Sequence, residues 1–131
     1  MAPHLPILPL AKALEPVSDL FLIDTWLGKE PVEGYIGITG RQADLNRSAE
    51  LVRESTIPVI LAGGLSPENV YDALMQVKPA GADSCTHTNA VESSGRTIRF
   101  RKDFQKVERF VQEVRRAEAA LLEDTPTYVY K

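Results

Sequence analysis

The chain has 131 residues, of which 44% are hydrophobic and 25% are charged, and its formal net charge is −3 at pH 7. This composition excludes a disordered chain, and the length fits one domain over residues 1–131 with a hydrophobic core of its own. The slight negative charge gives no general attraction to nucleic acid or to a membrane, so neither is an expected partner. No apolar stretch is long enough to cross a bilayer, and the single cysteine, Cys85, excludes an intrachain disulfide.

The first 15 residues are apolar, but prolines at positions 3, 6 and 9 interrupt them and a basic start is missing. This is a poor match to a secretory signal peptide, so we expect a cytoplasmic protein. We predict an irregular or helical start over 1–15. We also predict a loose tail over 124–131, because Pro126 prevents a helix from continuing.

The first predicted strand is the apolar run Leu20–Ile23. Residues 26–41 contain four glycines and are predicted to form a loop. A helix is then predicted to begin near Asp44 or Asn46 and to end near Ser55, because apolar residues three or four apart share one face.

The second predicted strand, Val59–Ala62, is a nearly continuous apolar run, which is typical of a parallel strand buried on both faces. Gly63–Gly64 follow and allow a tight turn with open N–H groups. Ser66 is predicted to be the N-cap of the next helix, and Pro67 its first residue. An anion at this turn would meet backbone amides near the positive end of a helix. The same residues also make an ordinary strand-to-helix turn, and local chemistry leaves both interpretations open.

Beyond this turn, apolar spacing predicts a helix with Val70, Ala73, Leu74 and Val77 on one face. A third strand over Ala82–Cys85 and a loop over Thr86–Lys102 are predicted next. Asp103 is predicted to cap the last helix. The apolar stripe of that helix consists of Phe104, Val107, Phe110, Val111, Val114 and Leu121.

Strands and helices that alternate in this way predict a parallel sheet with right-handed crossovers. A closed (β/α)₈ barrel needs eight strands and about 250 residues, so three strands do not close one. Several short motifs also occur in a characteristic order. They are Leu22-Ile23-Asp24-Thr25, Gly37-Ile38-Thr39-Gly40, LAGGLSPENV from Leu61 to Val70, Val77-Lys78-Pro79, Asp83 and Lys102-Asp103.

In this order and spacing, residues 15 to 115 resemble the C-terminal part of the phosphoribosylanthranilate isomerase family. These are ribulose-phosphate-binding barrels of tryptophan biosynthesis. The resemblance implies an α/β fold class, namely a partial TIM (β/α) barrel of about three C-terminal βα units with parallel strands.

The reaction that this resemblance implies is an Amadori rearrangement, an intramolecular isomerisation of an aminoaldose phosphate to an aminoketose phosphate. It needs an acid to open the ribose ring and a base to move a proton from C2. Asp24 matches the family's general acid, and it directly follows a predicted strand, where barrel enzymes carry catalytic residues. The alternative is that Asp24 caps the following loop or accepts a bond from a backbone amide.

The resemblance places phosphate binding in the turns after the last two strands. The implied phosphate and substrate ligands are Gly40, Gly63, Gly64, Asp83, Thr86, His87 and Thr88. His87 stands where the family usually has a glycine, so a backbone position that favours positive φ carries a side chain. A protonated His87 can instead pair with phosphate. Ile38 likewise replaces a usual glycine beside Gly40.

Two functional residues of the family match nothing in this sequence. One is the general base, a cysteine on the first barrel strand, and the other is an arginine of the N-terminal half that binds the anthranilate carboxylate. Cys85 falls on the last predicted strand, so it is expected to be a buried, inert thiol. Asp83, Cys85 and His87 alternate and would share a face of that strand, but their spacing matches no familiar zinc motif. No metal and no cofactor are expected.

Three hypotheses follow. The first is an isomerase of this family, which acts on a phosphorylated sugar and needs a homo-oligomer or a complementing N-terminal half-barrel to supply its base. The second is a non-catalytic phosphate-binding partial barrel. The third is a truncated fragment without independent activity. Two free edges and one open face of a three-stranded sheet favour association.

Overall fold

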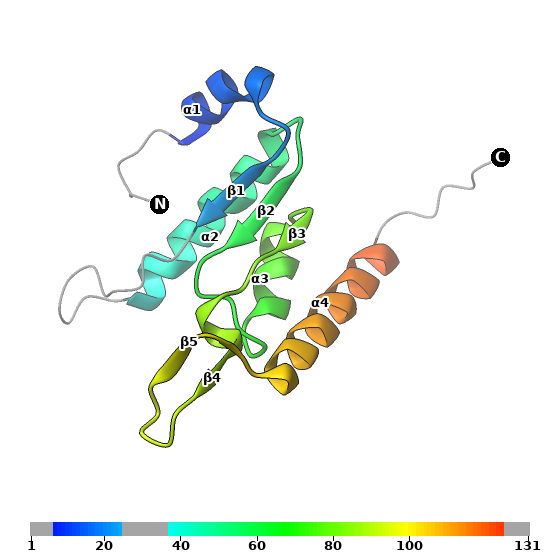
Figure 1. Cartoon of the computed structure of the whole chain (residues 1–131). Coiled ribbons are helices and arrows are strands. Elements are labelled where there is room, and N and C mark those ends of the chain that lie inside the picture. The colour runs from blue at the N-terminus through cyan, green and yellow to red at the C-terminus, as the bar shows by residue number, and fades with distance from the viewer. Residues whose placement is uncertain (1–6, 25–36, 125–131) are drawn as a thin grey trace.

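A computed structural model describes residues 7–24 and 37–124 of the chain (Figure 1). Its centre is a three-stranded sheet in the order β1-β2-β3, formed by β1 (Phe21–Asp24), β2 (Val59–Ala62) and β3 (Gly81–Ala82). Both pairings are parallel, with Asp24 opposite Ala62 and Leu61 opposite Ala82. The predicted α/β alternation with parallel strands is therefore confirmed. The described residues show no closed sheet.

The third strand is shorter than predicted, because β3 covers Gly81–Ala82 rather than Ala82–Cys85. A Cβ at Gly81 would lie 3.0 Å from Ile60 Cδ1, so a larger residue at this position would require the terminal methyl of Ile60 to shift. The chain then leaves the sheet at Asp83, whose N–H donates to the Leu61 carbonyl at 2.8 Å.

Four α-helices accompany the strands in the described part of the chain: α1 (Ile7–Leu14), α2 (Gly37–Glu54), α3 (Val70–Val77) and α4 (Phe104–Asp124). A short 3₁₀ turn, Glu15–Val17, follows α1 and precedes β1. Helix α2 begins at Gly37, so the prediction of a loop through residue 41 was wrong. Glycine lowers helix stability by only about 1 kcal/mol relative to alanine, so two glycines do not prevent a helix of this length. None of the described helices is long and apolar enough to cross a membrane.

The core lies between the sheet and the helices behind it in Figure 1. Leu61 of β2 is fully buried. The apolar face predicted for α3 is also buried, and it consists of Val70, Ala73, Leu74 and Val77. The predicted stripe of α4 is only partly confirmed. Phe110 is buried, whereas Phe104 and Val111 are exposed, because α4 contacts α3 along a narrower face than the apolar pattern suggests.

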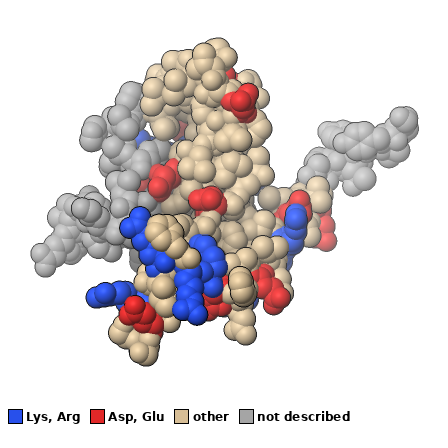
Figure 2. Space-filling model, in the orientation of Figure 1, with Lys and Arg blue, Asp and Glu red and all other residues tan. Residues whose placement is uncertain are grey.

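The opposite face of the sheet carries no helix among the described residues. Leu22 of β1 is 58% exposed on this face, and Leu20 just before the strand is 50% exposed. Figure 2, drawn from the same side as Figure 1, shows largely uncharged surface over the strands and a group of basic residues below them. A parallel sheet is normally covered on both faces, and the described residues provide a covering layer on only one of them.

The predicted loop over Thr86–Lys102 is instead a 3₁₀ turn, η2 (Thr86–Thr88), followed by an antiparallel hairpin of β4 (Asn89–Val91) and β5 (Thr97–Lys102). Gly95 has a φ of 91° and makes the turn between the strands. Strand β5 is exposed at every position except the half-buried Ile98. It therefore lacks the apolar alternation that reveals a strand in a sequence.

Candidate functional site

Three segments that the sequence singled out meet at the carboxyl edge of the sheet. Asp24 is the last residue of β1 and lies in register with Ala62, the last residue of β2. The Gly63–Gly64 turn begins directly after Ala62. Asp83 directly follows β3, and its N–H donates to the carbonyl of Leu61 in β2. Asp24 and Asp83 are both exposed. The structure thus places these residues at one edge of the sheet, while their roles stay predictions.

The diglycine turn has a backbone that other residues rarely adopt. The φ angles of Gly63 and Gly64 are 104° and 67°, both in the left-handed region that favours glycine. The Asn69 side chain holds this turn, because its Oδ1 accepts from the Ser66 N–H at 2.8 Å and its Nδ2 donates to the Gly64 carbonyl at 3.0 Å. Side-chain bonding thus fixes the shape of the turn before any ligand binds.

The N-cap of α3 is Asn69, not Ser66 as predicted. Residues 67–69 first form a turn, in which the Ser66 carbonyl accepts from the N–H groups of Asn69 and Val70. The Asn69 side chain then returns to the Ser66 N–H in the way that a capping box does. The predicted start of α3 was therefore three residues too early, and the capping contact is made by the Asn69 side chain rather than by Ser66.

The turn after β3 is attached to the diglycine turn through Ser84. The Ser84 hydroxyl donates to the Leu65 carbonyl at 2.9 Å and lies 3.4 Å from Thr88 Oγ1. Thr88 is 4% exposed, and its hydroxyl donates to the Cys85 carbonyl at 3.1 Å. The two turns that the family resemblance assigns to phosphate binding therefore form one bonded unit.

Lys102, at the end of the hairpin, also contacts this unit. Its Nζ lies 2.6 Å from the Cys85 carbonyl and 3.0 Å from Thr88 Oγ1, and donates to both. The sequence prediction missed the contacts of Ser84, Asn69 and Lys102. The spacing of Asn69 after Ser66 was an available signal. The Lys102-Asp103 motif was noted in the sequence, but no contact was predicted for Lys102.

The remaining predicted residues differ in exposure. Thr86 and His87 are exposed, whereas Thr88 is buried. Cys85 is exposed, so the prediction of a buried thiol was wrong; β3 ends at Ala82, which leaves Cys85 in a surface turn. Gly40 lies in α2 instead of a loop, and Figure 1 shows that this helix begins toward the end of the molecule where the strands finish. Within the described residues, no cluster of three or more His, Cys, Asp and Glu can hold a metal ion.

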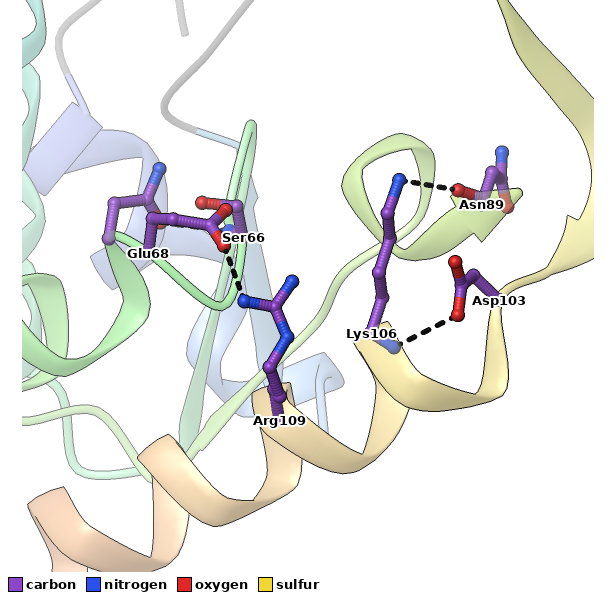
Figure 3. Close-up of polar contacts among 7 residues, drawn as sticks. Ser66, Glu68, Asn89, Asp103, Lys106 and Arg109 are labelled. Atoms are coloured by element: carbon purple, nitrogen blue, oxygen red, sulfur yellow. Dashed lines mark hydrogen bonds and ion pairs between the residues drawn. The ribbon is translucent and has the colours of Figure 1, made fainter. Parts of the chain in front are cut away.

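The start of α4 is fixed beside the site by polar contacts (Figure 3). Asp103 caps the helix as predicted, because its Oδ1 accepts from the N–H groups of Gln105 at 2.9 Å and Lys106 at 3.3 Å. The Lys106 Nζ donates to the Asn89 carbonyl at 3.1 Å, and Arg109 forms an ion pair with Glu68 at 3.1 Å. Helix α4 is thus joined both to the hairpin and to the segment after the diglycine turn.

Comparison with known proteins identifies the family. The model of N-(5'-phosphoribosyl)anthranilate (PRA) isomerase matches residues 8–113 of the chain. The chain belongs to the PRA isomerase family. The isomerase of Methanothrix thermoacetophila is 41% identical over 99 residues, which are 76% of this chain and 41% of that protein. The isomerase of Haloferax volcanii is 39% identical over 111 residues, which are 85% of this chain and 45% of that protein.

Among solved structures, the PRA isomerase of Thermococcus kodakaraensis matches with a TM-score of 0.55 and 34% sequence identity, over 80% of this chain and 44% of that one. The chain therefore spans less than half the length of each of these three relatives. The family consists of isomerases of tryptophan biosynthesis built on a TIM barrel. The match to a PRA isomerase structure supports the strand and helix arrangement described above.

Proposed function

We propose that the chain binds a phosphorylated sugar at the carboxyl edge of its sheet and contributes the general acid, Asp24, to a PRA isomerase reaction. The observation that supports this most strongly is the bonded unit of two turns beside Asp24. The diglycine turn is held by Asn69, and Ser84 attaches the turn after β3 to it. A phosphate between these turns would meet preorganised backbone amides, which cost little to reorganise on binding.

The Amadori rearrangement needs a proton donor at the ribose ring oxygen and a base at C2. Asp24 is exposed at the end of β1, the position from which a barrel strand presents a catalytic group. The family resemblance assigns the base to the N-terminal half of the barrel. The described residues hold no counterpart of that base, since Cys85 lies in the turn after β3.

We infer that the partner which completes the site is the N-terminal set of βα units of a barrel of this family. The matched regions make up 41% and 45% of the two relatives above, so more than half of each relative lies outside the matched region. The open face with Leu22 is one surface that such units would cover. The other is a groove of about 490 Å³ between β3 and α4, lined in part by Gly81, Ala82, Leu121 and Leu122.

A complementation assay tests this function. The chain is mixed with the N-terminal part of the Thermococcus kodakaraensis isomerase, ending before the strand that matches β1, and turnover of phosphoribosylanthranilate is followed by fluorescence. We expect activity from the mixture alone, loss of that activity with Asp24→Asn, and no loss with the exposed Asp19→Asn. No activity in any mixture, or equal activity of the Asp24 variant, would reject the isomerase role. Assembly of the chain only with itself would reject the proposed partner.

A non-catalytic phosphate-binding module is the second candidate. The altered last turn favours it, because His87 occupies a position that is glycine in the family and the acid has no matched base. This candidate predicts phosphate binding by the chain with no turnover in the complementation assay. A cytoplasmic location accompanies both candidates as a proposal.

A further inference from the structure

The charge balance at the carboxyl edge poses a problem for an anionic ligand. Asp83 lies exposed at this edge, and its carboxylate would repel a phosphate dianion. Backbone amides supply hydrogen bonds but no full positive charge. A fixed cation close to the two turns would offset this repulsion.

Lys102 is such a cation. Its ammonium is fixed to the turn after β3 by its bonds to the Cys85 carbonyl and to Thr88 Oγ1. Thr88 is itself buried and held, and its hydroxyl lies 3.4 Å from Ser84 Oγ, which bonds to the residue after the diglycine turn. The charge of Lys102 is thus separated from the diglycine turn by two hydroxyl groups.

The donor count of Lys102 leaves room for a ligand. An ammonium has three N–H donors, and the two bonds above use two of them. The side chain is exposed, so the third donor is accessible from solvent. Arg101, the preceding residue of β5, is also exposed, but alternation along a strand directs its side chain to the other face of the hairpin.

We propose that Lys102 supplies the positive charge of the phosphate site and donates its third N–H to a phosphate oxygen. The proposal rests on the proposed function, because it assumes that phosphate binds between these turns. It assigns a ligand role to a side chain of β5 that contacts the turn in which His87 stands where the family has a glycine. A compact ammonium is well suited to phosphate as a point charge.

The test is a titration of the whole ¹⁵N-labelled chain with inorganic phosphate at pH 7.5, followed through the amide signals of Gly63 and Gly64. We expect Lys102→Met to weaken binding about tenfold or more, which is typical for loss of a hydrogen bond to a charged group. Arg101→Met removes the same charge from the neighbouring residue and is the matched control, with an expected change of less than about twofold. Lys102→Arg should retain most of the affinity.

Salt dependence separates a charge role from a merely structural one. If Lys102 contacts phosphate, raising the sodium chloride concentration weakens binding more in the wild type than in Lys102→Met. If Lys102 only holds the hairpin to the turn, the residual binding of the variant keeps the wild-type salt dependence, and the proposal is overturned. Equal effects of Lys102→Met and Arg101→Met, large or small, also overturn it. Absence of phosphate binding by the wild type would instead reject the phosphate site of the proposed function itself.

Discussion

Replacing Asn69 by alanine tests how the candidate phosphate turn is held. The change removes two partly buried hydrogen bonds, one from the Ser66 N–H and one to the Gly64 carbonyl. Each is worth about 1 kcal/mol net, and Ser66, which is 7% exposed, would keep a backbone donor with poor access to water. We expect a loss of about 2 to 3 kcal/mol in the free energy of unfolding.

Urea unfolding followed by far-ultraviolet circular dichroism measures this loss, and amide hydrogen exchange at Ser66 locates it. Asn46→Ala is the matched control, because Asn46 accepts a bond from Gln76 on the exposed surface. Its free energy of unfolding should change by no more than about 0.5 kcal/mol. If Asn69→Ala costs as little as the control and Ser66 exchange is unchanged, the side chain does not hold the turn.

The other stability and titration predictions rest on single contacts. Leu61→Ala should lower the free energy of unfolding by about 3 kcal/mol because Leu61 is fully buried, whereas Leu22→Ala, at a 58% exposed position, should cost under about 1 kcal/mol in the same urea assay. Asp103→Ala should lower the free energy of unfolding by about 1 kcal/mol, because it removes the cap of α4. A free energy of unfolding equal to that of the wild type within experimental error would contradict this. The hydrogen bond from Arg116 holds the pKa of Glu113 below its usual value, so NMR titration should show that pKa rising in Arg116→Gln. Because the pKa is lowered in the folded state, this pair stabilises the fold above the unfolded pKa of Glu113, and the contribution disappears as the pH falls through the folded pKa.

The parts of the fold that the sequence predicted correctly are those where local chemistry and packing agree. Val59–Ala62 is apolar throughout and becomes the central strand, and the glycine pair after it takes the left-handed backbone that only glycine favours. The buried face of α3 and the Asp103 cap followed from spacing and residue type.

The wrong predictions concern segments whose structure depends on tertiary contacts rather than on local sequence. Strand β5 carries basic residues on exposed positions, so its pairing with β4 left no apolar signal in the sequence. Helix α2 includes glycines that local propensity assigns to a loop. Lys102 shows the same limit within the site, because only the folded chain brings its ammonium to the Cys85 carbonyl, 17 residues away in sequence.

One structural relation connects the exposed face of the sheet to the proposed role of Asp24. Leu22 and Asp24 are two residues apart on β1, so they lie on the same face of the sheet. Barrel units that cover Leu22 would therefore also enclose Asp24 and complete its site. A substitution at Leu22 that weakens binding of the partner should then also lower the activity of the mixture.

Leu22→Asp tests this coupling in the complementation mixture. The variant places a charge on the surface to be buried, so we expect association measured by analytical ultracentrifugation and PRA turnover to fall in parallel, by about tenfold or more. The folded chain should tolerate the change, because the position is 58% exposed, and circular dichroism of the variant alone provides the check. Asp24→Asn should abolish turnover while association stays near the wild-type value. If Leu22→Asp lowers neither quantity, the partner does not cover this face, and the site at Asp24 is not completed by the barrel units proposed here.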